Sequence, residues 1–137
     1  MFLFKEYSKF RVMDNYNLCI QVTPMPCNTN ENEDIFGGWL LSQMDLAGCI
    51  ECKNYYAGRY VTITIDKMVF KEPVQVGDIL SIYCKILNVG NTSITVDIIS
   101  KIKKIYTKEI IEVTRGVFKY VCIDQDKKPK KIKKTSL

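Results

Sequence analysis

One aspartate, Asp45, lies inside a run of mainly apolar residues, "GGWLLSQMDLAGCI", residues 37 to 50. The spacing of these residues is typical of a helix, and at 100° per residue Asp45 shares a face with Leu41 and Cys49. A carboxylate in apolar surroundings is costly, so we expect Asp45 to be paired, hydrogen-bonded or protonated. Two interpretations stay open at this point: a structural aspartate, or a general base or nucleophile.

The two glycines that open this run, Gly37 and Gly38, favour the catalytic interpretation. A helix start leaves backbone N–H groups without intrahelical acceptors, and the positive end of the helix dipole lies behind them. Such a group of donors can bind an oxyanion. A carbonyl polarised there, with a carboxylate further along the helix, predicts acyl transfer to water.

Other catalytic chemistries are excluded by residue type. The chain has no histidine, which removes every Ser-His-Asp and Cys-His mechanism. Cys49 and Cys52 form a C-x-x-C, but there is no second pair to complete a zinc site. We therefore predict no metal site and interpret the cysteines as small buried hydrophobic residues. The six cysteines are Cys19, Cys27, Cys49, Cys52, Cys84 and Cys122.

The size and charge of the chain indicate one globular domain. The 137 residues are enough for a single core, and 47% are hydrophobic against 26% charged. The net charge is +5, and six of the 20 Lys and Arg residues lie in residues 127 to 134. The rest of the chain carries 14 Lys and Arg against 15 Asp and Glu and is nearly neutral. We predict an extension over 1–15, a domain over 16–126 and a solvated, mobile lysine-rich tail over 127–137, without nucleic-acid binding.

The apolar segments predict a soluble, cytoplasmic protein that does not bind membranes. The N-terminal apolar residues are interrupted at Lys5 and follow no basic stretch, unlike a signal peptide. Polar residues such as Gln43 and Glu51 interrupt the longest apolar run, which is too short to span a bilayer.

Hydrophobic periodicity predicts the order strand, long helix, four strands. The helix is expected from Gly37 or Gly38 to about Tyr56, and period-two patterns rich in Ile, Val and Thr predict the strands. Gly90 and Asn91 predict a tight hairpin. This α+β layout requires the helix to lie across one face of a curved antiparallel sheet. The strands are expected at 16–23, 59–74, 78–89, 92–105 and 110–124.

Residues 25–48, "MPCNTNENEDIFGGWLLSQMDLAG", closely resemble the signature of the hotdog-fold acyl-CoA thioesterases of the YciA type. The resemblance continues through residues 61–83, 89–98 and 112–124, in register. It implies a single hotdog domain: a long central helix wrapped by a curved antiparallel sheet of five to six strands. It also implies edge-to-edge dimers, assembled into hexamers as trimers of dimers, that hydrolyse acyl-CoA to free acid and CoA without a metal or other cofactor.

The resemblance also implies roles for individual residues. The family's catalytic aspartate falls on Asp45, and its second polar position falls on Asp34. Carbonyl polarisation falls on the amides of Gly37 and Gly38. Related enzymes place the two acidic or amide groups on opposite protomers, so each site would need a dimer.

Two further groups of residues are candidates for contact with CoA. The resemblance places the hairpin near the pantetheine and nucleotide, and lysines at the end of the following strand could meet its phosphates, although lysines there also protect a sheet edge. The alternative function is a non-catalytic hotdog protein that senses CoA ligands. The candidate residues are Gly90, Asn91, Thr92, Ser93, Lys101 and Lys103.

Overall fold

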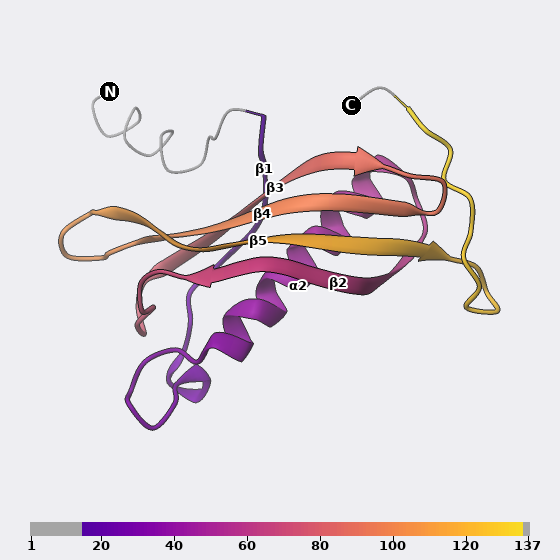
Figure 1. The fold of residues 1–137 in the computed structure, drawn as a ribbon. Helices are drawn as coiled ribbons and strands as arrows, with labels where there is room; N and C mark the ends of the chain where they lie inside the picture. Colours follow the sequence, from indigo (N-terminus) through magenta and orange to yellow (C-terminus); the bar gives the residue numbers. More distant parts are fainter. Residues whose placement is uncertain (1–14, 136–137) are drawn as a thin grey trace.

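The computed structural model describes residues 15–135, so the predicted N-terminal extension lies outside the described residues except for Asn15. The chain forms one long helix and five strands (Figure 1). The helix starts where predicted and ends within one residue of the expected position. The elements are β1 (Asn17–Val22), a 3-10 turn η1 (Pro26–Asn28), α2 (Gly37–Tyr55), β2 (Arg59–Phe70), β3 (Ile79–Val89), β4 (Ser93–Lys103) and β5 (Ile110–Ile123).

The five strands form one antiparallel sheet in the order β1-β3-β4-β5-β2. The predicted hairpin joins β3 to β4, and the Gly90 N–H donates to the Ser93 carbonyl at 2.7 Å. The strands that precede and follow the helix, β1 and β2, are the two edges of the sheet. The chain must therefore cross the whole sheet between them.

Helix α2 makes this crossing on one face of the sheet and contacts all five strands (Figure 1). Its 19 residues extend over about 28 Å at 1.5 Å per residue, against about 19 Å for the width of five strands. The helix is thus long enough to cover the sheet from edge to edge. This is the predicted hotdog arrangement, with five strands. Its core joins Leu40, Met44, Ala47 and Cys52 of the helix to Ile82, Val96, Ile98, Phe118 and Tyr120 of the sheet.

Gly48 allows the closest approach between helix and sheet. A Cβ atom added there would overlap the Tyr120 hydroxyl oxygen and lie 2.5 Å from the ring carbon Cζ. Tyr120 is fully buried and cannot move into solvent. Only glycine at this helical position lets β5 pack under the centre of α2.

Gly48→Ala is therefore expected to destabilise the fold by about 1–3 kcal/mol, the usual cost of overpacking. Helix propensity alone predicts the opposite sign, a gain of about 1 kcal/mol for alanine over glycine. Urea unfolding measures the difference, with Ser42→Ala at an exposed position of the same helix as the control. A stabilised Gly48→Ala protein would contradict the close approach of α2 and β5.

Residues 127–135, which belong to the predicted solvated tail, lie against the domain at Ile132. Ile132 is 2% exposed, and its N–H donates to the Asn91 carbonyl at 2.8 Å. The Lys130 N–H donates to Cys122 O near the end of β5. Ile132 lies among these lysines and supplies an apolar contact that the lysine content of the segment did not predict. The six lysine side chains are exposed.

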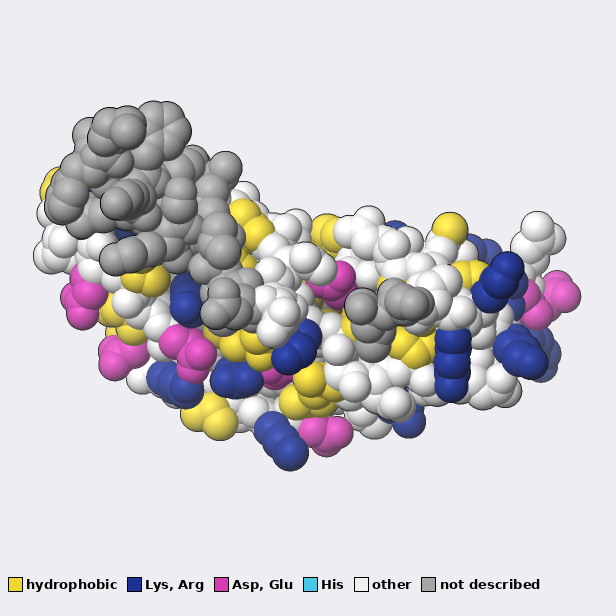
Figure 2. Space-filling model, turned by 90° about the horizontal axis from the view of Figure 1, so that it is seen from above, with side chains coloured by type: hydrophobic (Ala, Val, Ile, Leu, Met, Phe, Trp, Pro, Cys, Tyr) yellow, Lys and Arg dark blue, Asp and Glu magenta, His cyan; other side chains and the backbone are white. Residues whose placement is uncertain are grey.

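Charged side chains are interspersed on the face seen in Figure 2. Lys and Arg side chains lie among acidic and hydrophobic ones there rather than in one continuous patch. Within residues 15–135, no helix combines the length and the apolar character needed to span a bilayer.

Candidate active site

Asp45 lies at the edge of the buried face of α2. The residue before it, Met44, is fully buried, whereas the residue after it, Leu46, is 56% exposed. Asp45 itself is partly buried. Its Oδ1 atom accepts a hydrogen bond of 2.5 Å from the Thr62 hydroxyl of β2. The expectation that this carboxylate is hydrogen-bonded is confirmed, and the bond fixes the direction in which it points.

Tyr120 holds the helix backbone at the same residue. Its hydroxyl donates to the main-chain carbonyl of Asp45 at 2.9 Å. Burial, followed by the nearby Asp45 charge, raises the pKa of Tyr120 above its ordinary value. The phenol therefore stays protonated and continues to donate at every pH where the enzyme would work. Two strands, β2 and β5, thus position one helical residue.

The start of α2 presents free amides, as predicted. Phe36 is the N-cap residue, and no side chain caps the helix. Both Gly37 and Gly38 are exposed. Among the described residues, no acceptor bonds their N–H groups, while the Trp39 N–H already bonds Phe36 O at 3.1 Å. These two donors remain available for an oxyanion.

Asp34 and Gly37 line one cavity at the start of the helix. A cavity of about 370 Å³ at the helix start is lined by Asp34, Gly37 and Phe70, among others. The loop that carries Asp34 is held by the Asn30 N–H, which donates to Asp34 O at 2.8 Å, and by the Ile35 N–H, which donates to Val74 O at 2.9 Å. The structure therefore brings Asp34 and Gly37 to one cavity.

Asp45 does not share this cavity within one chain. It is eight positions after Gly37, which corresponds to about 12 Å along the helix axis. A thioester carbon and its oxygen are bonded to each other, so one carbonyl cannot contact both groups of the same chain. One chain therefore does not bring the Asp45 carboxylate and the Gly37 amide to the same carbonyl.

The free edge β2, which carries Thr62, is suited to such pairing. Unpaired edge strands usually carry charged residues that prevent association. This one exposes Arg59, Asp66 and Lys67 but also an apolar row. Ile63 is 54% exposed and Val69 53% exposed. The row consists of Val61, Ile63, Ile65, Val69 and Phe70.

The residues predicted to contact CoA lie at opposite ends of β4. The hairpin of Gly90, Asn91, Thr92 and Ser93 is at its start, and Lys101 and Lys103 are at its end. Ser93 and Lys103 are ten residues apart, which corresponds to about 33 Å of strand. One chain therefore does not bring the two groups together, and a role for both in one site stays a prediction.

Thr62, Tyr120 and Glu51 were not found from the sequence. The first two contact Asp45 only through the sheet register, which local patterns do not determine. Glu51 is 5% exposed, and it is more deeply buried than every residue predicted for the site. Glu51 is seven residues after the buried Met44 and therefore lies on the same helical face. This spacing could have predicted from the sequence that Glu51 is buried.

Comparisons with known proteins agree with this geometry. Residues 32–107 match the model of the Thioesterase superfamily. The Escherichia coli acyl-CoA thioester hydrolase YciA is 40% identical over 117 residues, which cover 83% of this chain and 89% of that protein.

Two solved structures are similar over most of the chain. The hexameric thioesterase from Yersinia pestis has a TM-score of 0.85 at 40% identity and covers 90% of this chain and 100% of its own. An aspartate-to-alanine variant of a hexameric broad-specificity acyl-coenzyme A thioesterase has a TM-score of 0.82 at 37% identity, covering 85% and 86%. With its hotdog fold, its helix-start amides and its fixed helical carboxylate, this chain belongs to the Thioesterase superfamily.

Proposed function

We propose that this protein hydrolyses acyl-CoA thioesters to a free acid and CoA. The observation that carries the proposal is the Asp45 carboxylate, partly buried and held by Thr62 on a helix whose first amides are free. The acyl-CoA thioester hydrolase of E. coli and the solved acyl-coenzyme A thioesterase support the substrate class.

Asp45 acts either as a general base or as a nucleophile. As a base, it takes a proton from water while the water oxygen bonds to the thioester carbon. As a nucleophile, its oxygen bonds to that carbon and forms an anhydride that water then cleaves. In both cases the C–S bond breaks and the CoA thiolate leaves and is protonated. A single turnover in ¹⁸O-water separates the routes by whether label enters the acid or the Asp45 carboxylate.

The site is completed by a second copy of the chain. Pairing of two β2 edges buries the apolar row and places the Asp45 region of one copy beside its partner. The oxyanion then meets the Gly37 and Gly38 amides of the opposite copy. The hexameric thioesterases described above support assembly of such dimers into a hexamer.

A turnover panel from acetyl-CoA to palmitoyl-CoA, with released thiol as the readout, tests the activity. We expect hydrolysis of at least one chain-length class by the purified full chain. Saturable CoA binding with no thiol release from any member would contradict the enzyme proposal and support the ligand-sensing alternative.

Thr62→Val is expected to lower kcat by about 10-fold to 100-fold, because a hydrogen bond to a charged group contributes about 1.5–3 kcal/mol. Valine preserves the shape and β-branching of threonine, so the strand is retained. Steady-state kinetics measures the effect, and Thr64→Val, an exposed threonine on the same strand, is the matched control. Equal activity of both variants would remove Thr62 from the positioning of Asp45.

The amide donors are tested at Gly37 by a pair of substitutions. Gly37→Pro removes the N–H at the first helical position, where proline is tolerated, and Phe36 already has the extended ψ of 147° that precedes proline. We expect kcat to fall by about 10²–10³-fold. Gly37→Ala retains the N–H, and its Cβ would lie 3.3 Å from a carbon of the Phe70 ring. Equal loss in both variants would indicate a steric cause instead.

A further inference from the structure

A buried carboxylate that the proposed reaction does not use lies near the C-terminal end of α2. Glu51 is 5% exposed, and among the described residues no lysine or arginine pairs with it. Lys85 lines the same cavity, but its Nζ lies over the Tyr16 ring, 5.7 Å from the centroid. An anion in this position requires compensation.

Two thiols surround this carboxylate. Cys19 of β1 and Cys84 of β3 come from adjacent strands, and a bulge at Cys19 interrupts their register. The Cys19 Sγ, the Cys84 Sγ and a Glu51 carboxylate oxygen all lie within 4.8 Å of one another. Three elements far apart in the sequence therefore place three potential anionic ligands around one point.

We propose that Cys19, Glu51 and Cys84 form a binding site for one Zn²⁺ ion per chain. In tetrahedral zinc sites with Zn–S near 2.3 Å and Zn–O near 2.0 Å, ligand atoms are about 3.5–3.8 Å apart. The Cys19 Sγ is 3.7 Å from Glu51 Oε2, which already has this spacing. A small contraction around the third ligand completes the geometry.

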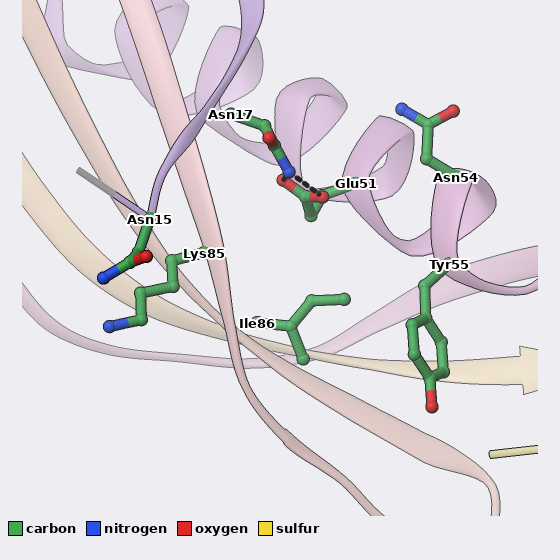
Figure 3. Close-up of a pocket in the computed structure, with 7 residues that line it drawn as sticks. All are labelled: Asn15, Asn17, Glu51, Asn54, Tyr55, Lys85 and Ile86. Atoms are coloured by element: carbon green, nitrogen blue, oxygen red, sulfur yellow. Dashed lines mark hydrogen bonds between the residues drawn. The ribbon is translucent and has the colours of Figure 1, made fainter. Parts of the chain in front are cut away.

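The surroundings supply the other requirements of a metal site. The Asn17 Nδ2 donates to Glu51 Oε1 at 2.8 Å and to Oε2 at 3.1 Å, which orients the carboxylate as an outer-shell partner does (Figure 3). Glu51 and Asn17 line a cavity of about 550 Å³, so an ion can approach the carboxylate from this side, whereas the two thiols do not line the cavity.

The donor set selects among metals. Two thiolates with one carboxylate suit the borderline-soft Zn²⁺ better than Mg²⁺ or Ca²⁺, which prefer oxygen, or Cu⁺, which prefers sulfur. Binding releases a proton from each thiol. The bound ion joins the edge strand β1 to α2 and β3, and thus stabilises an edge that otherwise pairs on one side only.

This site is separate from the C-x-x-C of the sequence. Neither Cys49 nor Cys52 is one of the three ligands. The prediction of no metal site depended on pairs close in sequence, whereas this group forms only when β1, α2 and β3 assemble.

Cobalt titration of the reduced, metal-free full chain tests the proposal. We expect one equivalent of Co²⁺ to produce a thiolate-to-cobalt charge-transfer band, and Zn²⁺ to displace it. Cys19→Ser is expected to lose the band with its circular dichroism spectrum unchanged, and Asn17→Ala to weaken binding by about 10-fold to 100-fold. Cys49→Ser, a partly buried cysteine like Cys19, is the matched control and should retain the band.

Three results would overturn the site. The first is the absence of a charge-transfer band in the wild-type chain with excess Co²⁺. The second is a band that persists in Cys19→Ser. The third is a band lost in Cys49→Ser and retained in Cys19→Ser, which would place the metal on the C-x-x-C. A second measurement uses only the wild-type chain and so does not depend on how the serine variants fold. Zn²⁺ should slow amide hydrogen exchange in β1. Unchanged exchange would also contradict the proposal.

Discussion

Asp45→Asn is expected to lower kcat for acyl-CoA hydrolysis by about 10²–10⁴-fold, the usual contribution of a positioned acid or base. The amide of asparagine can still accept the hydrogen bond that Thr62 donates to Asp45 Oδ1, so the fold and the position of the side chain are retained. It can neither take a proton from water nor attack a thioester. Binding of CoA should change little, because the loss concerns the transition state only.

The control for this substitution is Asp66→Asn, which removes a negative charge from an exposed position on β2. Steady-state kinetics and calorimetric CoA binding of both variants separate the contributions. Full turnover by Asp45→Asn would defeat the assignment of the catalytic carboxylate. A parallel loss of kcat and of thermal stability would instead assign Asp45 to the fold.

Ile63→Lys is expected to dissociate the assembly and to lower activity by about 10²–10³-fold. Ile63 is 54% exposed in one chain, and in a two-fold interface each substitution places a second lysine nearby, so that like charges repel. A separated protomer keeps its own Asp45 but loses the Gly37 and Gly38 amides of the other copy. The expected decrease in activity is the one that follows removal of an oxyanion donor. Size-exclusion chromatography with light scattering measures the mass, and kinetics on the same fractions measures turnover.

Ile105→Lys serves as its control because Ile105 is 39% exposed but lies in the turn between β4 and β5, away from the β2 edge. It should leave mass and kcat at wild-type values. A monomeric Ile63→Lys protein with wild-type kcat would show that one chain contains the whole site.

The fold was predictable because its signals are local. Period-two patterns located all five strands, the glycines located the helix start, and Gly90 and Asn91 located the hairpin. Asp45 was recognisable because a charge on an apolar helical face conflicts with burial. Its carboxylate is hydrogen-bonded, as one of the expected outcomes required.

Contacts between distant segments were not predictable in this way. Thr62 contacts Asp45 because β2 pairs with β5 in one register, which depends on the complete sheet. Cys19 and Cys84 meet for the same reason across β1 and β3. The lysine-rich tail packs against the domain through one isoleucine, Ile132. The prediction from the sequence was based on the surrounding lysines and did not take this apolar residue into account.

The most direct test of the shared site is complementation between two inactive variants. Asp45→Asn and Gly37→Pro chains are co-expressed with different tags in equal amounts, and total turnover of the mixed assemblies is measured. If Asp45 of one copy acts with the helix-start amides of the other, a mixed dimer contains one doubly altered site and one intact site. Random pairing then restores about a quarter of wild-type activity. Activity that stays at the average of the two parent variants would contradict a site built from two copies.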